Sequence, residues 1–372
     1  MAISTAFAVI SVPALWNRVR GHAALRLAQR VGLVLICQAL AVAVVFASVN
    51  HTNTFFVTWA ELWGAAGPDV VTIQGGDTVR PQPSGDAAPD QPTLLAPTSD
   101  ADPRSTQSPA GLPAGYTPTN GGAARAQVVG PASGVSGELD VWTPPGYDAH
   151  HAGGYPVILA LDGYPGNPID PLNGLDLSTA VPAAIAAGQL TASIVVSATT
   201  NVDGKNWGCA DAPGGPKVGT WLTRDVPALL SRDFAVRPGL RWAVLGVSEG
   251  AGCAVRLALT DPTQFAAAIS LSGGNAPDAP PLRRTAADRH ANDLRTLAGN
   301  GATPPVDLLL AATREEVGTA SDARALQQAA GPGVHVDLEL LDHGGHNWSV
   351  WRQMTPPALA WLGARWPGPV RG

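Results

Sequence analysis

Ser248 is the residue whose neighbours in the sequence most clearly indicate chemistry. It lies in the run GVSEG (246–250), after the apolar run 242–245 and before a small-residue pattern, 251–259, typical of a helix. A serine at the apex of a strand–turn–helix exposes its hydroxyl, and the flanking glycines let strand and helix approach closely. We therefore predict a nucleophilic serine. The alternative is a turn with an incidental serine, because short glycine motifs occur by chance in a chain with 42 glycines.

A serine hydroxyl needs a neighbouring base to remove its proton, and His346 is the best placed of the eight histidines. It follows the apolar run 334–341 and precedes a helical pattern at 357–364. The two glycines in front of it allow a tight loop that would aim the imidazole back over a sheet. His343, three residues earlier, is the rival, but it has no such glycines in front of it.

The base in turn needs a carboxylate that fixes the imidazole tautomer and stabilises the imidazolium. In the chain order Ser, acid, His, the acid should follow the strand before the histidine's strand. That strand is 306–310, and both Glu315 and Glu316 come shortly after it. Asp322 is a weaker candidate, since it falls inside the next helical pattern. The residues leave both glutamates open, and we prefer Glu316.

An oxyanion hole needs backbone donors beside the nucleophile. The N–H of Glu249 opens the helix after Ser248, and the N–H of Tyr164, in the loop after the apolar run 156–161, is the expected second donor. An ordinary strand-end turn is the alternative for that loop. Trp207 and Trp348 are candidates for lining the substrate site, with aromatic core packing as the competing interpretation.

The elements that must position these residues form an alternating pattern. Short apolar runs predict strands at 127–129, 138–142, 156–161, 193–198, 242–245, 265–271, 306–310 and 334–341. Helical patterns lie between or after them at 177–189, 219–230, 321–330 and 357–364. Such alternation predicts an α/β domain over 126–372, with a mostly parallel sheet covered by helices on both faces. Ligands bind at the carboxyl ends of such strands, where the candidate residues fall.

The N-terminal part predicts a membrane anchor. The run 31–49 is uncharged and long enough to cross a hydrocarbon core of about 30 Å, and the shorter run 2–16 is a second candidate span. The intervening stretch, 17–30, carries arginines and no acidic residue, which favours the cytoplasmic side and directs the rest of the chain outside the cytoplasm. A cleaved signal peptide and a buried soluble helix are the alternatives.

Two segments separate this anchor from the α/β domain. Residues 82–125 are rich in Pro, Gly, Ala, Ser and Thr without apolar periodicity, which predicts a flexible linker. Residues 50–81 form a juxtamembrane segment whose Trp59 and Trp63 suit a membrane interface or a short surface helix. Later in the chain, 273–301 is expected to form a lid or rim of the site.

Composition limits the partners. A formal charge of −6 gives no electrostatic reason for nucleic-acid binding. The three cysteines make no metal-ligand spacing, and the predicted serine chemistry needs no cofactor, so neither a metal nor an organic cofactor is expected. Cys37 lies in the apolar run 31–49, and a Cys209–Cys253 disulfide is left open, since it would require an oxidising compartment.

Over about 127–366 the chain resembles the esterase family of α/β-hydrolases, which includes esterase D, feruloyl esterases and the antigen 85 mycolyltransferases. The resemblance rests on joined motifs: LDGY (161–164), WLTRDVP (221–227), LGVSEGAG (245–252), DPTQF (261–265), SLSG (270–273) and GGHNWSVW (344–351). It implies Ser248 as nucleophile, His346 as base, and an acid where Glu315 and Glu316 stand. Glu316 precedes His346 by 30 residues, as does, approximately, an aspartate in feruloyl-esterase-like members.

The departure from aspartate to glutamate keeps both acids in play. In mycolyltransferases the glutamate lies inside the next helix, where this chain has Gln327 and Gln328, which argues against a close mycolyltransferase. The expectation is thus a membrane-anchored, extracytoplasmic serine esterase acting on a small-molecule, lipid or sugar ester through an acyl-enzyme. The alternatives are an acyltransferase that passes the acyl group to a cell-envelope sugar, and a non-catalytic domain that binds the envelope.

Overall fold

The structure is a computed structural model that describes residues 16, 18, 21–63, 71–74, 112–119 and 121–366, with only the backbone of 52–53 and 71–74. The candidate span 2–16, apart from its last residue, and most of the expected linker lie outside the described residues. The chain divides into two compact units. The first consists of Met1–Ala65 with Gly345–Asn347, and the second of Ala66–Gly344 with Trp348–Gly372.

The first unit is dominated by one long helix, α2 (Ala23–Asn53), which contains the apolar run 31–49. Its stretch Ala23–His51 contains an 18-residue window with a mean hydropathy of 2.5, so the helix is long and apolar enough to cross a membrane. At about 1.5 Å per residue it exceeds the roughly 30 Å of a hydrocarbon core. A short helix, α3 (Trp59–Leu62), follows, and Trp59 and Trp63 at its two ends are exposed.

The second unit is built on a ten-stranded sheet with the order β1-β10-β9-β8-β7-β5-β6-β4-β3-β2. The six strands from β10 to β6 in that order run parallel, and the others pair antiparallel. The strands are β1 (Val71–Gln74), β2 (Thr117–Pro118), β3 (Ala124–Val129), β4 (Ser136–Trp142), β5 (Val157–Leu161), β6 (Ile194–Ala198), β7 (Trp242–Val247), β8 (Phe265–Leu271), β9 (Val306–Thr313) and β10 (Val334–Leu341). The predicted mostly parallel α/β sheet is confirmed.

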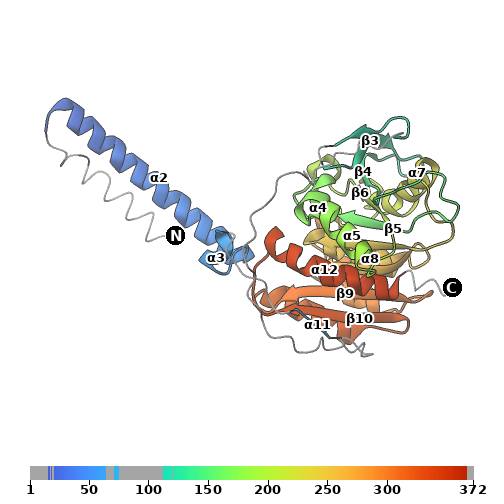
Figure 1. Cartoon of the computed structure of the whole chain (residues 1–372). Helices are drawn as coiled ribbons and strands as arrows, with labels where there is room; N and C mark the ends of the chain where they lie inside the picture. Colours follow the sequence, from blue (N-terminus) through green and yellow to red (C-terminus); the bar gives the residue numbers. More distant parts are fainter. Residues whose placement is uncertain are drawn as a thin grey trace, which may run out of the picture. The chain divides into compact units, whose positions relative to one another are not determined.

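Helices cover both faces of this sheet (Figure 1). The helices of this unit are α4 (Ile169–Gly174), α5 (Leu177–Ala186), α6 (Val218–Thr220) continuing through a π-turn into α7 (Val226–Asp233), α8 (Glu249–Thr260), α9 (Ala286–Asn292), α10 (Leu294–Gly299), α11 (Val317–Ala329) and α12 (Trp348–Arg365). Helices α4, α5 and α12 pack in one core cluster, and α7, α8, α10 and α11 pack in the other. Successive residues of β5 alternate between the two clusters, as expected for a strand buried on both faces.

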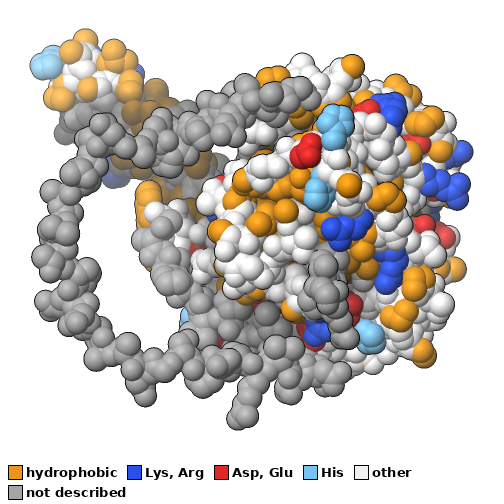
Figure 2. Space-filling view, turned by 45° about the vertical axis from the view of Figure 1, so that its right-hand side comes forward, with side chains coloured by type: hydrophobic (Ala, Val, Ile, Leu, Met, Phe, Trp, Pro, Cys, Tyr) orange, Lys and Arg blue, Asp and Glu red, His pale blue; other side chains and the backbone are white. Residues whose placement is uncertain are grey.

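Two strands fall outside the range 126–372 expected for the domain. Strand β1 lies in the juxtamembrane range and pairs antiparallel with β10, and β2 lies in the linker range and pairs with β3. Edge pairing of this kind uses backbone groups and needs no side-chain periodicity, so the sequence pattern does not announce it. On the face of the molecule shown in Figure 2, Lys and Arg side chains lie interspersed with Asp and Glu.

Candidate active site

Ser248 lies at the sharp turn between β7 and α8 with φ 55° and ψ −119°. A positive φ is rare for a non-glycine residue, and strained backbone of this kind clusters at functional sites. The flanking glycines explain how the turn is built. A Cβ on Gly246 would lie 1.9 Å from the carbonyl oxygen of Gly250, and a Cβ on Gly250 would lie 2.2 Å from that of Asp162. The glycines are therefore required by close backbone approach, as the motif predicted.

The loop after β5 lies directly against the serine. A Cβ on Gly163 would be 3.2 Å from Cβ of Ser248 and 3.7 Å from its Oγ. Tyr164, the expected second oxyanion donor, is the next residue, and its side chain is 46% exposed. Glu249, the first expected donor, is the first residue of α8. The structure thus brings both backbone segments of the predicted oxyanion hole to the nucleophile's turn.

A cluster of buried polar side chains holds the loop after β5 in place. Asp162 is 1% exposed and accepts hydrogen bonds from the hydroxyl of Thr200 and, at 3.0 Å, from Nδ2 of Asn201. Asn201 Nδ2 also donates to the carbonyl oxygens of Gly163 and Gly166. Burial raises the pKa of Asp162 to about 6, against the opposing effect of these hydrogen bonds. Sequence reasoning missed Thr200 and Asn201, because they follow a different strand, β6.

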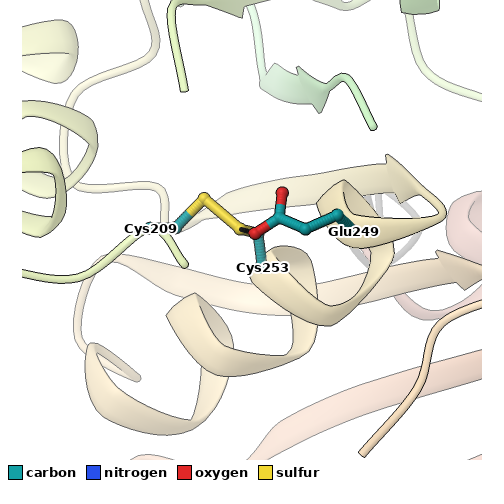
Figure 3. A group of neighbouring side chains, drawn as sticks. All are labelled: Cys209, Glu249 and Cys253. Atoms are coloured by element: carbon teal, nitrogen blue, oxygen red, sulfur yellow. Dashed lines mark hydrogen bonds between the residues drawn. A yellow bond between two sulfur atoms is a disulfide. The ribbon is translucent and has the colours of Figure 1, made fainter. Parts of the chain in front are cut away.

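On the other side of the turn, a disulfide joins Cys209 to Cys253 with a Cα–Cα distance of 5.5 Å (Figure 3). The bridge that the sequence left open is therefore present. Cys253 lies one turn after Glu249 on α8, and its Sγ is 3.3 Å from Oε1 of Glu249. Burial, together with the charges of Asp162 and Asp278, raises the pKa of Glu249 to about 8, and Arg256 opposes the shift.

The ligand atoms of Cys209, Glu249 and Cys253 all lie within 4.8 Å of one another, which is close enough for a metal site. Metal-binding cysteines coordinate as thiolates, however, and both sulfurs here are bonded to each other (Figure 3). Only one carboxylate remains as a ligand. We therefore assign the group to structure and not to metal binding.

A small cavity of about 40 Å³ opens beside the nucleophile. Drug-sized ligands typically occupy pockets of roughly 300–1,000 Å³, so this cavity has room for only a small group. Its walls combine the start of α8, the disulfide and the loop after β8, and include Ser248, Glu249, Cys253, Arg256, Asn275 and Asp278.

The two candidate acids have different environments. The Glu316 side chain is buried, its Oε2 accepts a hydrogen bond of 2.7 Å from Ser272 Oγ, and its backbone N–H donates to Thr313 Oγ1. Ser272 Oγ in turn accepts from the indole N–H of Trp351 at 3.0 Å. Ser248, Ser272 and Glu316 thus follow the adjacent strands β7, β8 and β9. Neither Ser272 nor Thr313 was singled out from the sequence.

Glu315 is directed elsewhere. Its Oε1 lies 3.2 Å from Nδ1 of His343, and its Oε2 accepts from the backbone N–H of Gly344 at 2.8 Å. The side chain of His343 is 75% exposed. The rival histidine is therefore paired with the less favoured acid in a solvent-facing contact.

His346 lies in the loop between β10 and α12, within the segment Gly345–Asn347 that belongs to the first unit. Its backbone N–H donates to the carbonyl oxygen of Thr54 at 2.9 Å, and its ring centroid is 6.4 Å from that of Phe55. Gly344 before it has φ 121°, and its carbonyl oxygen accepts from Thr313 Oγ1. By chain order, His346 follows the strand next to the strand of Glu316, as predicted for the base.

The remaining candidates are engaged in packing or in holding loops. Trp207 donates its indole N–H to the carbonyl oxygen of Val202 at 2.9 Å, and Trp348 packs against Gly174 and lies edge-on to Trp351. Asp322 accepts the backbone N–H of Asn275 at 3.0 Å. It therefore holds the beginning of 273–301, the expected rim, which carries α9 and α10.

Comparison with known proteins identifies the family. Residues 135–362 match the family described as "Putative esterase". An uncharacterised protein of Corynebacterium glutamicum is 25% identical over 248 residues, which cover 60% of this chain and 56% of that protein. The chain thus spans just over half the length of this relative.

Two solved structures show the same fold. An S-formylglutathione hydrolase from Agrobacterium tumefaciens superposes with a TM-score of 0.56 at 18% identity, covering 68% of this chain and 99% of that one. A ferulic acid esterase superposes with a TM-score of 0.51, also at 18% identity, covering 66% of this chain and 98% of that one. The fold is that of an α/β-hydrolase, and the chain belongs to the esterase family.

Proposed function

We propose that this protein is a membrane-anchored serine esterase that hydrolyses a carboxylic ester outside the cytoplasm. The observation that carries the proposal is the backbone of Ser248, held at positive φ between β7 and α8 by glycines that tolerate no Cβ. Such a turn serves no packing purpose that an ordinary strand–helix connection would not serve. It does present a hydroxyl at the sheet edge where α/β-hydrolases bind their substrates.

In the proposed reaction, Ser248 Oγ attacks the ester carbonyl carbon while His346 takes its proton. The tetrahedral oxyanion is bound by the N–H groups of Glu249 and Tyr164. Collapse expels the alcohol, which receives the proton from His346, and leaves an acyl-enzyme. Water, deprotonated by the same histidine, then attacks the acyl-enzyme and forms a second tetrahedral intermediate. Its collapse releases the carboxylic acid, and His346 returns the proton to Ser248 Oγ.

Glu316 is the acid we propose for this triad. It is buried and held by Ser272, so its carboxylate has one fixed orientation, as a group that must fix an imidazole tautomer requires. Glu315 already bonds His343 and Gly344 in a partly exposed contact. The two neighbouring glutamates are thus assigned different roles by their partners.

The small cavity beside Ser248 supports a short acyl group as the substrate's acid part. It does not distinguish water from a cell-envelope sugar as the acceptor of that acyl group. The extracytoplasmic location is supported by the arginines of the stretch 17–30, at and before the start of α2, and by the disulfide, since structural disulfides persist in oxidising compartments. A cleaved signal sequence would place the domain on the same side without anchoring it.

The test uses the full chain in detergent, with p-nitrophenyl esters of increasing acyl length and a fluorophosphonate probe. We expect turnover and labelling in the wild type, neither in Ser248→Ala, and the fastest hydrolysis with acetyl or propionyl esters. Added sugar alcohols that capture the acyl group in place of water would favour the acyltransferase. Equal inertness of the wild type and Ser248→Ala, both folded, would leave the non-catalytic binding domain.

A further inference from the structure

Glu61 is a buried carboxylate in a segment to which the proposed reaction assigns no role. Only 5% of its surface is exposed, although it belongs to the four-residue helix α3 next to the long apolar helix. Its Oε2 accepts the backbone N–H of Val57 at 2.7 Å. Its Oε1 accepts the backbone N–H of Gly345 at 2.6 Å and Nδ2 of Asn347 at 2.7 Å. Buried charges are retained where hydrogen bonds satisfy them, as here.

The backbone before Glu61 makes contacts with the same loop. The N–H of His346 donates to the carbonyl oxygen of Thr54, and Asn347 Nδ2 donates to that of Phe55 at 2.6 Å. A Cβ on Gly345 would lie 2.4 Å from the Thr54 oxygen and 2.5 Å from the Phe55 oxygen. We call residues 54–61 the juxtamembrane clamp. Each residue of Gly345–Asn347 thus contacts this clamp. Both sides of this contact belong to the first unit.

The clamp is itself tied to the end of α2. Asn50, in the last turn of that helix, donates from Nδ2 to the carbonyl oxygen of Phe56 at 2.7 Å and accepts its N–H at Oδ1 at 2.8 Å. Thr58 caps α3 by accepting the N–H of Glu61. The chain that leaves the apolar helix is therefore folded back on itself before it reaches the histidine loop.

We infer that Glu61 is a positioning residue for the proposed base, holding the loop that carries His346 through the N–H of Gly345 and the amide of Asn347. The inference rests on the proposed function. Its physical basis is that catalytic side chains must be held to within about 0.5 Å, which requires a supporting shell of hydrogen bonds. On this view the membrane-proximal segment belongs to the catalytic machinery and does more than tether it.

The test uses the full chain in detergent and compares Glu61→Ala and Glu61→Gln with the matched control Trp63→Ala, which changes an exposed side chain of the same segment. Loss of an outer-shell partner typically costs about 10–100-fold, so we expect kcat to fall by that amount in Glu61→Ala with KM little changed. We also expect the acidic limb of the pH profile of kcat/KM, which reports the base in the free enzyme, to shift. The control should retain wild-type values.

A charge exchange separates positioning from general damage. Asn347→Asp places a second carboxylate against Glu61, and we expect it to lower kcat at least as much as Glu61→Ala. In the double variant Glu61→Gln/Asn347→Asp, the new amide can donate to the new carboxylate, so activity should recover above that of Asn347→Asp. Additive losses in the double variant would contradict the inference.

Amide hydrogen exchange gives a readout that does not depend on turnover. The N–H groups of Gly345 and His346 are bonded to the clamp, so their exchange should accelerate in Glu61→Ala and not in Trp63→Ala. Unchanged exchange and unchanged kcat in Glu61→Ala would overturn the inference while leaving the esterase intact. A wild type as inert as Ser248→Ala, with exchange still accelerated in Glu61→Ala, would instead refute the proposed function and reduce the clamp to a structural contact.

Discussion

The turn that carries Ser248 and the loop that carries His346 achieve fixed geometry by different means. At the serine, glycines two residues to either side and the neighbouring strands supply the close contacts, so the turn is built inside the α/β unit. At the histidine, Gly345 donates to Glu61, which lies 284 positions earlier in the chain. The two halves of the proposed reaction therefore depend on different parts of the sequence, one local and one distant.

Glu316→Gln should cause the largest loss of activity. It tests whether Glu316, which is held inside the α/β unit as Ser248 is, acts as the acid of the triad. Glutamine keeps the shape but cannot stabilise an imidazolium or enforce its tautomer, and an equivalent change in a serine protease costs about 10⁴ in kcat. Glu315→Gln, whose partner His343 is exposed, should stay within about threefold of the wild type. Steady-state hydrolysis of a p-nitrophenyl ester measures both. The reverse ranking would assign the triad to Glu315.

Gly250→Ala should break the serine's turn. The new Cβ would lie 2.2 Å from the carbonyl oxygen of Asp162, a backbone atom that cannot move without shifting the loop of Gly163. We expect fluorophosphonate labelling of Ser248 to slow by about 100-fold and the free energy of unfolding to fall by about 1–3 kcal/mol. Gly252→Ala, also in α8, meets nothing closer than 3.5 Å and is the control for stability. Equal stability of the two variants would contradict the packing argument.

The same contrast explains what the sequence could predict. The strands, the turn at Ser248 and the esterase family follow from patterns within about a dozen residues, and the structure and the family match confirm the fold. The triad and the oxyanion hole remain predictions. The sequence favoured Glu316 over Glu315 by its spacing from His346, whereas the hydrogen bond from Ser272, 44 residues away, could be found only in the structure.

The role of residues 54–61 was beyond sequence reasoning for a physical reason. The segment 50–81 has no sustained periodicity, and its tryptophans indicated only a membrane interface or a surface helix. Glu61 contacts its partners through two N–H groups and one amide, which leave no pattern in composition or spacing. Gly345 was expected to serve a tight loop, whereas the structure shows that its missing side chain makes room for the backbone of Thr54 and Phe55.

Removing the disulfide next to the Ser248 turn should lower the free energy of unfolding more than it lowers activity. Cys209 and Cys253 are separated by 44 residues, and cross-linking a loop of that size stabilises the fold by about 4 kcal/mol in the chain-entropy model. We expect the double variant Cys209→Ser/Cys253→Ser to unfold at lower urea concentration, and reductant to shift the wild type but not the variant. If reductant shifted both equally, another effect would be responsible, and Cys37→Ser would identify it.

Glu249→Gln should have the smallest effect on activity of these changes, and its effect should be visible in the pH dependence of stability. Burial raises the pKa of Glu249 in the folded protein from 4.5 to about 8, so between these values the folded state binds more protons than the unfolded state. The contribution of Glu249 to the stability of the folded state is therefore fully present below about pH 4.5 and is lost as pH rises towards 8.

In Glu249→Gln no proton is exchanged at this position, so the midpoint of thermal unfolding should fall less steeply between pH 5 and 8 than in the wild type. Asp176→Asn, at an exposed aspartate with φ 52° that asparagine tolerates, is the control and should follow the wild-type slope. A steeper slope in Glu249→Gln would mean that the carboxylate is stabilised as an anion by Arg256, which would reverse the sign argued here. Asp162, whose pKa is raised to about 6, would then account for the remaining slope of the wild type.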